Sequence, residues 1–389
     1  QESIEEILEM AKLKEEGRIK AIVVTGCLAE RYQQEIAKEL PEVNAVVGIG
    51  ANKEIARIVR EALEGKRIET FPPKCELPLE GERVQSTPSY FSYLKIAEGC
   101  DNHCTYCAIP LIRGGYRSRK IEDILAEAEK LAQWGVKELM VIAQDTSRYG
   151  EDLYGEGKLP QLLTELCKVE RLRWIRVLYC YPERITDELL EVMAKEDKIL
   201  KYMDLPLQHC SRQVLRAMNR QGDRESLSAL IRKIREKVPG IVLRTTFMVG
   251  FPGETEEAFE ELAEFAKEMR FERMGCFAYS QEEGTPAARL PDQISREIKE
   301  HRQELMMEQQ MALMDEMSRE MVGKTITVLN EGWDRYAECC FGRSAADAPE
   351  IDTKVFFTVE GKKPYPGMFV QVEITDTMDC DLIGQVVTT

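Results

Sequence analysis

Between Tyr93 and Tyr279 the chain repeats one pattern six times: a short apolar run followed by an amphipathic helical stretch. Such runs are typical of buried strands, and their alternation with helices indicates a parallel sheet. We predict strands at 93–97, 138–143, 174–178, 202–205, 242–248 and 274–279. Six units form a partial (β/α)6 barrel, short of the eight that close a complete one. A functional site of this fold is expected in the loops after the carboxyl ends of the strands.

The residues before this repeat also alternate between helix and strand patterns. Strands are expected at 21–25 and 45–47, with helices before, between and after them up to about residue 63. We therefore expect residues 1–64 to form part of a separate α/β domain. Residues 65–89 carry proline, glycine and charge without a steady period, and we interpret them as a linker.

The pattern changes again after residue 321, where a methionine-rich helical stretch ends. Short strands are predicted at 325–330, 354–358, 368–374 and 383–387, separated by Gly, Pro and Asp, as in a small antiparallel β-barrel. Residues 322–389 carry six basic and eleven acidic side chains, a net charge of −5. This charge disfavours binding to a phosphate backbone and favours a basic protein partner. The alternative is a solvated acidic face without a partner.

Three cysteines follow the first strand of the repeat in the spacing C-x3-C-x2-C: Cys100, Cys104 and Cys107. Three thiolates on one short loop suit a 4Fe–4S cluster that keeps one iron open for a further ligand. The alternatives are a zinc site, with His103 as the local fourth ligand, or thiols that hold no metal. We favour the cluster, because His103 lies between two of the cysteines, where reaching the same metal is awkward.

Polar residues and glycines follow the strands at the same predicted edge, and their convergence on one small ligand is a common arrangement in binding sites. Each also fits a structural role, such as a cap at the rim or a turn before a helix. Arg244 suits the planar carboxylate of a ligand, or equally a salt bridge to an acid at the rim. The candidate ligand contacts are Gln144, Asp145, Gln208, Arg244, Gly250, Pro252 and Gly253.

Composition narrows the setting of the protein. The net charge of −16 disfavours broad attraction to nucleic acid or anionic lipid. No apolar run approaches the roughly 18 residues that span a membrane, and no signal peptide is evident. Twelve cysteines, clustered in so long a chain, indicate metal binding in a reducing cytoplasm rather than disulfides. A helical pattern is already under way at Gln1, so we expect further sequence before it.

These motifs together resemble the radical S-adenosylmethionine (SAM) methylthiotransferases. The residues that carry the resemblance are Y-L-K-I-A-E-G-C-D-N-H-C-T-Y-C at 93–107, R-G at 113–114, S-R at 118–119 and G-F-P-G-E-T at 250–255. With the final barrel, the resemblance covers essentially the whole chain. It implies that 1–64 is the end of a methylthiotransferase domain, that 90–321 is a radical SAM domain, and that 322–389 is a TRAM barrel.

Within this family the chain is most similar to the branch that modifies an aspartate of small-subunit ribosomal protein twelve. The stretches concerned are A-Q-D-T-S-R-Y-G at 143–150, L-P-L-Q-H-C-S at 205–211 and G-R-S-A-A-D-A-P-E-I-D at 342–352. The implied activity is addition of a methylthio group to the β-carbon of that aspartate. The alternatives are a tRNA-adenosine methylthiotransferase, whose branch typically has Gln-Ser-Gly at 208–210, and a non-catalytic iron–sulfur protein that binds RNA or the ribosome.

The resemblance implies SAM and two 4Fe–4S clusters as cofactors. The first cluster would be held by the three cysteines of the 100–107 loop, and Tyr106 would pack near the adenine of SAM. Cys27, in G-C-L-A-E-R-Y, matches one of three ligands of the second cluster. The other two would precede Gln1, so we expect an incomplete second site in this chain. The implied partners are a basic ribosomal protein and a flavodoxin or ferredoxin reductant, without direct tRNA binding. No side-chain catalyst beyond the cluster ligands is implied.

Overall fold

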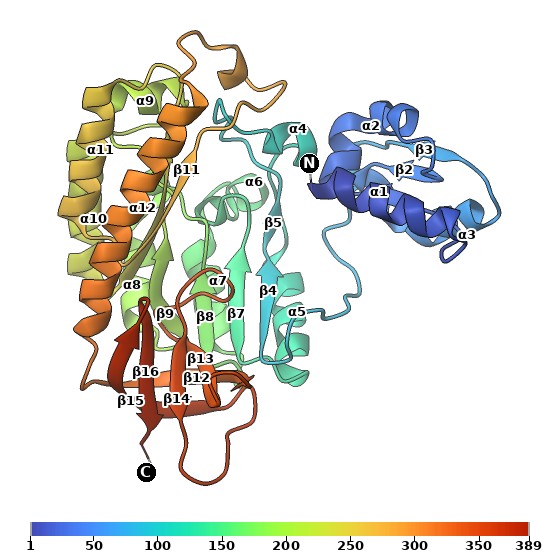
Figure 1. The fold of residues 1–389 in the computed structure, drawn as a ribbon. Helices are drawn as coiled ribbons and strands as arrows, with labels where there is room; N and C mark the ends of the chain where they lie inside the picture. The colour runs from blue at the N-terminus through green and yellow to red at the C-terminus, as the bar shows by residue number, and fades with distance from the viewer. Residues whose placement is uncertain (1, 388–389) are drawn as a thin grey trace. The chain divides into compact units, whose positions relative to one another are not determined.

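A computed structural model describes residues 2–387 (Figure 1). The chain divides into two compact units. The first comprises residues 1–83, 98–103 and 107–117, and the second comprises 84–97, 104–106 and 118–389. None of the helices in the described part of the chain is both long and apolar enough to cross a bilayer.

The first unit is built on a three-stranded parallel sheet with its strands in sequence order. Its strands are β1 (Val23–Thr25), β2 (Ala45–Val47) and β3 (Ile68–Thr70), and its helical segments are α1 (Glu2–Glu15), α2 (Cys27–Glu39), η1 (Ile49–Glu54), α3 (Ile55–Leu63), η2 (Lys74–Glu76) and α4 (Ile109–Arg113). All three residues of β2 are buried, because the sheet is covered on both faces. Helices α1 and α2 contribute Ile7, Ala11, Ala29 and Ile36 to the core.

Strand β3 lies inside the stretch that the sequence indicated as a linker. Its three residues are Ile, Glu and Thr, of which none is fully buried and one is exposed. Two of the three side chains are polar, so the run gives no apolar signal. Its pairing with β2, from Ala45–Ile68 to Val47–Thr70, is what identifies it as a strand.

The second unit contains the six-stranded parallel sheet that the repeat predicted (Figure 1). The order across the sheet is β4-β7-β8-β9-β10-β11, so neighbours in space are also successive strands of the repeat. Their bounds are β4 (Phe91–Lys95), β7 (Glu138–Ile142), β8 (Trp174–Val177), β9 (Ile199–Asp204), β10 (Val242–Val249) and β11 (Arg273–Ala278). Two short strands, β5 (Ala97–Glu98) and β6 (Arg117–Ser118), pair with each other. The partial (β/α)6 architecture is confirmed.

Helices and short helical turns connect these strands. They are α5 (Ile121–Gln133), η3 (Thr146–Arg148), α6 (Glu151–Tyr154), α7 (Leu159–Cys167), η4 (Pro182–Arg184), α8 (Asp187–Lys195), α9 (Arg212–Ala217), α10 (Arg224–Lys237), α11 (Glu256–Met269), η5 (Ala287–Arg289) and α12 (Arg296–Arg319). Side-chain caps fix several starts: Asp223 and Ser226 form a capping box on α10, and Thr255 caps α11. Helix α11 buries Phe265, which meets Phe247 of β10 edge-on at 6.3 Å.

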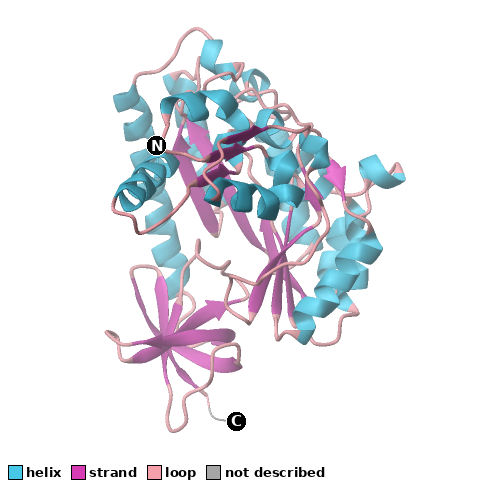
Figure 2. Cartoon of the chain, turned by 90° about the vertical axis from the view of Figure 1, so that its right-hand side faces the viewer, coloured by secondary structure: helices cyan, strands magenta, loops and turns pink. Residues whose placement is uncertain are grey.

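The end of the chain closes into a small barrel, seen as magenta strands near the C-terminus in Figure 2. Its strands, in the order β12-β13-β14-β16-β15, are β12 (Thr325–Asp334), β13 (Cys339–Ser344), β14 (Val355–Thr358), β16 (Asp381–Val386) and β15 (Phe369–Met378). All neighbouring pairs are antiparallel except β14 and β16, which run parallel. The sequence did not predict β13, because Gly342 and the buried Arg343 interrupt its apolar run.

The segment from Arg343 to Asp352 packs against the amino-terminal halves of the parallel strands. Glu138, the first residue of β7, accepts a hydrogen bond from Nε of Arg176 at 2.9 Å and another from Nη2 of Arg343 at 2.8 Å. The carbonyl of Ala345 accepts from Nη1 of the same Arg176 at 3.0 Å. All three charged side chains are buried, and Arg343 has a second carboxylate partner, because Glu331 accepts from its Nε at 2.8 Å.

The same segment reaches two more strands of the sheet. Asp347 accepts from Arg273, the first residue of β11, at 2.5 Å. Tyr202 of β9 donates from its hydroxyl to Asp352 at 2.7 Å. These contacts place the segment at the end of the sheet opposite the loops in which a site is expected.

Candidate active site

None of the three cysteines of the 100–107 loop forms a disulfide, and neither does Cys27. Cys100 and Cys104 are buried and Cys107 is half-buried. Among residues 2–387, no three Cys, His, Asp or Glu side chains are gathered closely enough to hold a metal ion. Cys100 and Cys107 belong to the first unit and Cys104 to the second. The donor set nevertheless suits the group that the sequence implies, because three cysteine thiols on one loop, outside any disulfide, are what a cluster with an open iron requires.

Cys104 has a neighbour that the sequence did not reveal. Its sulfur lies 2.7 Å from the hydroxyl of Tyr181, which follows the carboxyl end of β8. The guanidinium carbon of Arg220 lies 3.9 Å from the centre of the Tyr181 ring. Burial raises the pKa of Tyr181 well above its usual value, so the hydroxyl keeps its proton at neutral pH. The aromatic stretch Y-C-Y-P at 179–182, placed at a strand's carboxyl end, was the only signal available for it.

Thr105, the next residue of the loop, is anchored at the end of α9. Its backbone N–H donates to the carbonyl of Met218 at 3.0 Å, and its hydroxyl donates to the carbonyl of Ala217 at 2.7 Å. Its own carbonyl accepts from the N–H of Ala287 at 2.9 Å. Three bonds to two separate segments therefore fix the loop at this residue.

Tyr106 packs against an aromatic wall formed by residues from several strand ends. Its neighbours in this cluster are Val214, Met218, Phe251, Tyr279 and Ala287. The rings of Phe251 and Tyr279 lie 5.2 Å apart. In the described structure the hydroxyl of Tyr279 is buried without a hydrogen-bond partner. An apolar wall with one unused polar group is suited to an aromatic ligand such as a nucleobase.

Gln144 and Asp145 follow β7, and the structure gives them different surroundings. The side-chain oxygen of Gln144 is buried, and no hydrogen-bond partner for it occurs in residues 2–387. Asp145 accepts from the hydroxyl of Ser147 at 2.6 Å and lies 3.4 Å from Nε of Arg184. A buried acceptor without a partner costs free energy unless a ligand satisfies it, so Gln144 is the stronger ligand contact of the two.

Gln208 lies at the carboxyl end of β9 with its backbone in the left-handed region, at φ 70°. Its N–H donates to the carbonyl of Thr246 and its carbonyl accepts from the N–H of Met248, both at 2.8 Å. The backbone is therefore fixed against β10, and the half-buried side chain belongs to the candidate edge.

The G-F-P-G-E turn after β10 is organised by Glu254. Both carboxylate oxygens of Glu254 accept from the N–H of Gly250 at 3.0 Å, and one accepts from Arg302 at 2.6 Å. Gly250 has φ 71°, and a Cβ at this position would lie 2.2 Å from Cγ of Lys299, so only glycine fits. Pro252 is buried and Gly253 also has a positive φ, of 79°. The contacts of Glu254 and the positive φ angles of the glycines thus fix the conformation of the turn.

Arg244 is the third of the eight residues of β10, and its guanidinium pairs with Asp204 at 3.1 Å and with Asp352 at 3.8 Å. Asp204 is the last residue of β9, and Asp352 lies between β13 and β14. The described contacts of Arg244 are therefore those of a salt bridge, one of the two alternatives that the sequence offers, and a contact with the ligand stays a prediction.

In the first unit, Cys27 is the exposed first residue of α2. Arg113, the last residue of α4, donates from Nη2 to the sulfur of Cys27 at 3.3 Å. The other terminal nitrogen of Arg113 lies 3.7 Å from a carboxylate oxygen of the buried Glu98. A guanidinium therefore lies next to the Cys27 sulfur.

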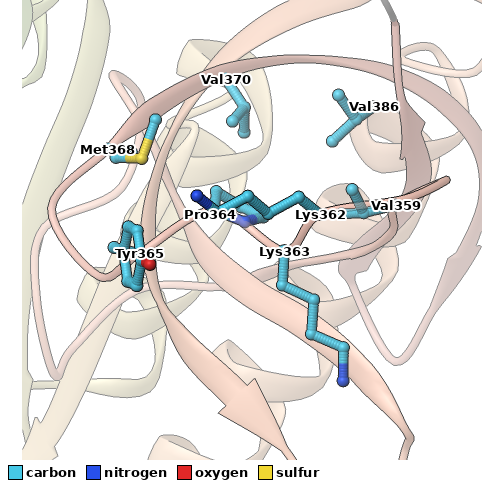
Figure 3. A pocket seen from close by; sticks show the side chains of 8 residues that line it. All are labelled: Val359, Lys362, Lys363, Pro364, Tyr365, Met368, Val370 and Val386. Atoms are coloured by element: carbon cyan, nitrogen blue, oxygen red, sulfur yellow. The ribbon is translucent and has the colours of Figure 1, made fainter.

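The C-terminal barrel contains a separate hollow of about 280 Å³ (Figure 3). It is lined by Val359, Lys362, Lys363, Pro364, Tyr365, Met368, Val370 and Val386. No metal-ligating or acidic side chain is among these residues, so the hollow does not resemble the site at the carboxyl ends of the strands.

Comparison with protein-family models divides the chain into three matched regions. Residues 94–266 match the radical SAM superfamily, residues 322–387 match the TRAM domain, and residues 1–48 match a family described as uncharacterized protein family UPF0004.

Two curated proteins show how similar full-length relatives are. The chain is 48% identical over 389 residues to the ribosomal protein uS12 methylthiotransferase RimO of Desulforamulus reducens, covering 99% of this chain and 87% of that protein. It is 50% identical over 391 residues to the protein of the same name from Pelotomaculum thermopropionicum, covering 100% and 87%.

A solved structure supports the fold. The radical SAM methyltransferase TsrM from Kitasatospora setae, solved with tryptophan and a SAM analogue, superposes with a TM-score of 0.54. The match covers 70% of this chain and 57% of that one at 16% identity. At this identity the likeness concerns the arrangement of helices and strands alone.

Proposed function

The chain belongs to the RimO family of ribosomal protein uS12 methylthiotransferases, and on that premise we propose that it adds a methylthio group to the β-carbon of an aspartate in protein uS12. The observation that carries the proposal is Cys104 of the three-thiol loop, whose sulfur lies 2.7 Å from the hydroxyl of Tyr181, a residue that follows the carboxyl end of β8 in the parallel sheet. An unactivated carbon has no proton acidic enough for a general base, so the reaction needs a radical cofactor.

Cys100, Cys104 and Cys107 would hold a 4Fe–4S cluster whose fourth iron binds SAM. When bound, this group supplies the electron that cleaves SAM and starts the radical reaction. Cys27 would supply one ligand to a second cluster, and Arg113 donates a hydrogen bond to its sulfur. The proposed reductant is a flavodoxin or ferredoxin.

The side chains at the carboxyl edge orient SAM and exclude water. Gln144 offers its unpartnered oxygen to a donor of the ligand, and Tyr106 with the aromatic wall receives the adenine. The turn at Gly250, Pro252 and Gly253 presents its backbone at the same edge. The ordered loop at Thr105 keeps these groups in register with the cysteines.

The proposed macromolecular partner is the basic ribosomal protein itself, and the proposed place of action is therefore the cytoplasm. The net charge of −5 over residues 322–389 supports a basic partner for the C-terminal barrel. A tRNA substrate would require a predominantly basic surface there.

The test is mass spectrometry of uS12 after anaerobic incubation of small ribosomal subunits with the reconstituted full-length enzyme, SAM and a reductant. We expect a methylthio mass increase on one aspartate, and none with Cys104→Ala. tRNA is analysed in parallel. Methylthiolated tRNA together with unmodified uS12 would show that tRNA is the substrate instead. Absence of 5′-deoxyadenosine would contradict an enzymatic role.

A further inference from the structure

We propose that Tyr181, supported by Arg220, sets the reduction potential of the cluster that Cys104 helps to hold. The inference rests on the proposed function, since it requires a cluster on this loop. Tyr181 and Arg220 are positioning residues in it: the first contacts a ligand sulfur, and the second acts through the first.

Tyr181 is held in place from two sides. Its backbone N–H donates to the hydroxyl of Ser147 at 2.9 Å, and Ser147 in turn donates to the buried Asp145. Its ring lies under the guanidinium of Arg220, 3.9 Å from centroid to carbon. The backbone hydrogen bond and the stacking on Arg220 together fix the Tyr181 ring in the orientation that places its hydroxyl 2.7 Å from the Cys104 sulfur.

Arg220 is itself fixed and 5% exposed. Its Nη2 donates to the carbonyl of Pro206 at 3.0 Å, and its backbone N–H donates to the carbonyl of Leu215 at 2.7 Å. Its Nε lies 3.8 Å from Glu183. The cation–π attraction between a guanidinium and an aromatic ring is stronger when both are buried, because little water competes for the charge.

The direction of the hydrogen bond follows from the chemistry of a cluster ligand. In the free protein either Cys104 or Tyr181 can be the donor. A cysteine that binds iron has lost its proton, so the Tyr181 hydroxyl is then the only donor of the pair.

A donor to a ligand sulfur stabilises the more negative, reduced cluster, and so does the nearby positive charge of Arg220. Both groups therefore raise the reduction potential. This favours electron uptake from a small electron-transfer protein.

Tyr181→Phe removes the hydroxyl alone and leaves the ring for Arg220. We expect reduction of the SAM-free cluster to become about tenfold less favourable, a shift of about 59 mV to more negative potential for one electron. The measurement is anaerobic potentiometry of the full-length reconstituted enzyme, followed by electron paramagnetic resonance. The control is Tyr149→Phe, which removes a buried hydroxyl that donates to the carbonyl of Arg119 at 2.8 Å.

Arg220 gives a second comparison. Arg220→Gln removes the charge and is expected to shift the potential in the same direction, whereas Arg220→Lys keeps the charge and is expected to shift it less. An unchanged potential in Tyr181→Phe at full iron content would overturn the inference and leave the proposed function intact. An unsubstituted enzyme that takes up no cluster iron would overturn both.

Discussion

Arg343 donates from Nη2 to Oε2 of Glu138 over 2.8 Å, although 205 residues separate the two in the chain. The other oxygen of Glu138 accepts from Arg176. One buried carboxylate therefore pairs with two buried guanidinium groups, one from the parallel sheet and one from the C-terminal barrel, and Glu331 supplies the second carboxylate by accepting from Nε of Arg343 at 2.8 Å. Removing one partner of such a group leaves an uncompensated charge in the interior.

Replacement of Glu138 by glutamine is expected to lower the free energy of unfolding by about 3–5 kcal/mol, because Arg176 loses its carboxylate partner and Arg343 is left with Glu331 alone. Urea unfolding followed by circular dichroism measures the change. The control is Glu156→Gln, an exposed carboxylate paired with Lys158, for which no measurable change is expected. Equal midpoints for the two variants would show that the buried pairs contribute nothing.

The effect of Glu138→Gln is expected to depend on pH. Burial alone would raise the pKa of Glu138, but the charges of Arg176 and Arg343 and their hydrogen bonds outweigh it and hold this pKa below its ordinary 4.5. A carboxyl whose native pKa is lowered stabilises the fold fully above the unfolded pKa, and this stabilisation is lost as pH falls through the native pKa.

The stability difference between Glu138→Gln and the unsubstituted protein should therefore be constant from pH 7 to about pH 5 and shrink below about pH 4.5. Urea unfolding from pH 7 to pH 3 measures it. A difference that stays constant down to pH 3 would contradict a lowered pKa of Glu138, because it would mean that this carboxyl binds protons equally in the folded and unfolded states.

His209 is expected to support the glycine turn through Glu254. Its Nδ1 accepts from the N–H of Ser211 at 2.9 Å, so the proton of the neutral ring is on Nε2, which lies 3.4 Å from Oε2 of Glu254. His209→Asn keeps the acceptor for Ser211 and loses the group facing Glu254. His209→Gln keeps a donor towards Glu254 and loses the acceptor.

If the turn contacts SAM, His209→Asn should weaken SAM binding about tenfold, a loss of about 1.4 kcal/mol, because it removes the buried nitrogen that lies 3.4 Å from Glu254, and His209→Gln should weaken it less. Isothermal titration calorimetry and thermal unfolding are measured together. If both variants lost SAM affinity equally, in parallel with a lower melting temperature, the cause would be a general effect on folding instead.

Arg244→Met is expected to destabilise the protein without changing SAM affinity. The change leaves Asp204 and Asp352 buried without their common cation, at a cost of about 3 kcal/mol. Arg244→Lys keeps the charge and should lose less. Urea unfolding and SAM calorimetry give the two readings, and weaker SAM binding in a stably folded Arg244→Met would return this residue to the ligand site.

The sequence predicted the parts of this fold that have strong local signals. The six strands of the parallel sheet are short and mainly apolar, and their bounds differ from the predicted ones by at most three residues. Strands β3 and β13 were not predicted, because their partners are set by pairing across the sheet and not by their own apolar content.

The candidate site divides in the same way. The spacing of Cys100, Cys104 and Cys107 is visible in the sequence, as is the glycine turn. The salt-bridge partners of Arg244 were not, because they come from separate segments that only the fold brings together. Tyr181 and Arg220 stand 39 positions apart and share no motif, so only their stacking reveals them.

The contact between Glu138 and Arg343 also has a consequence for synthesis. Glu138 and Arg176 can pair as soon as β8 has emerged from the ribosome. Arg343 is translated much later. Asp347, the partner of Arg273, follows that residue by 74 positions in the chain. A nascent chain that ends at α12 therefore lacks the two carboxylates, Asp347 and Asp352, that face Arg273 in the complete fold. The charged contacts that hold one end of the parallel sheet are therefore completed only when the segment from Arg343 to Asp352 has been translated.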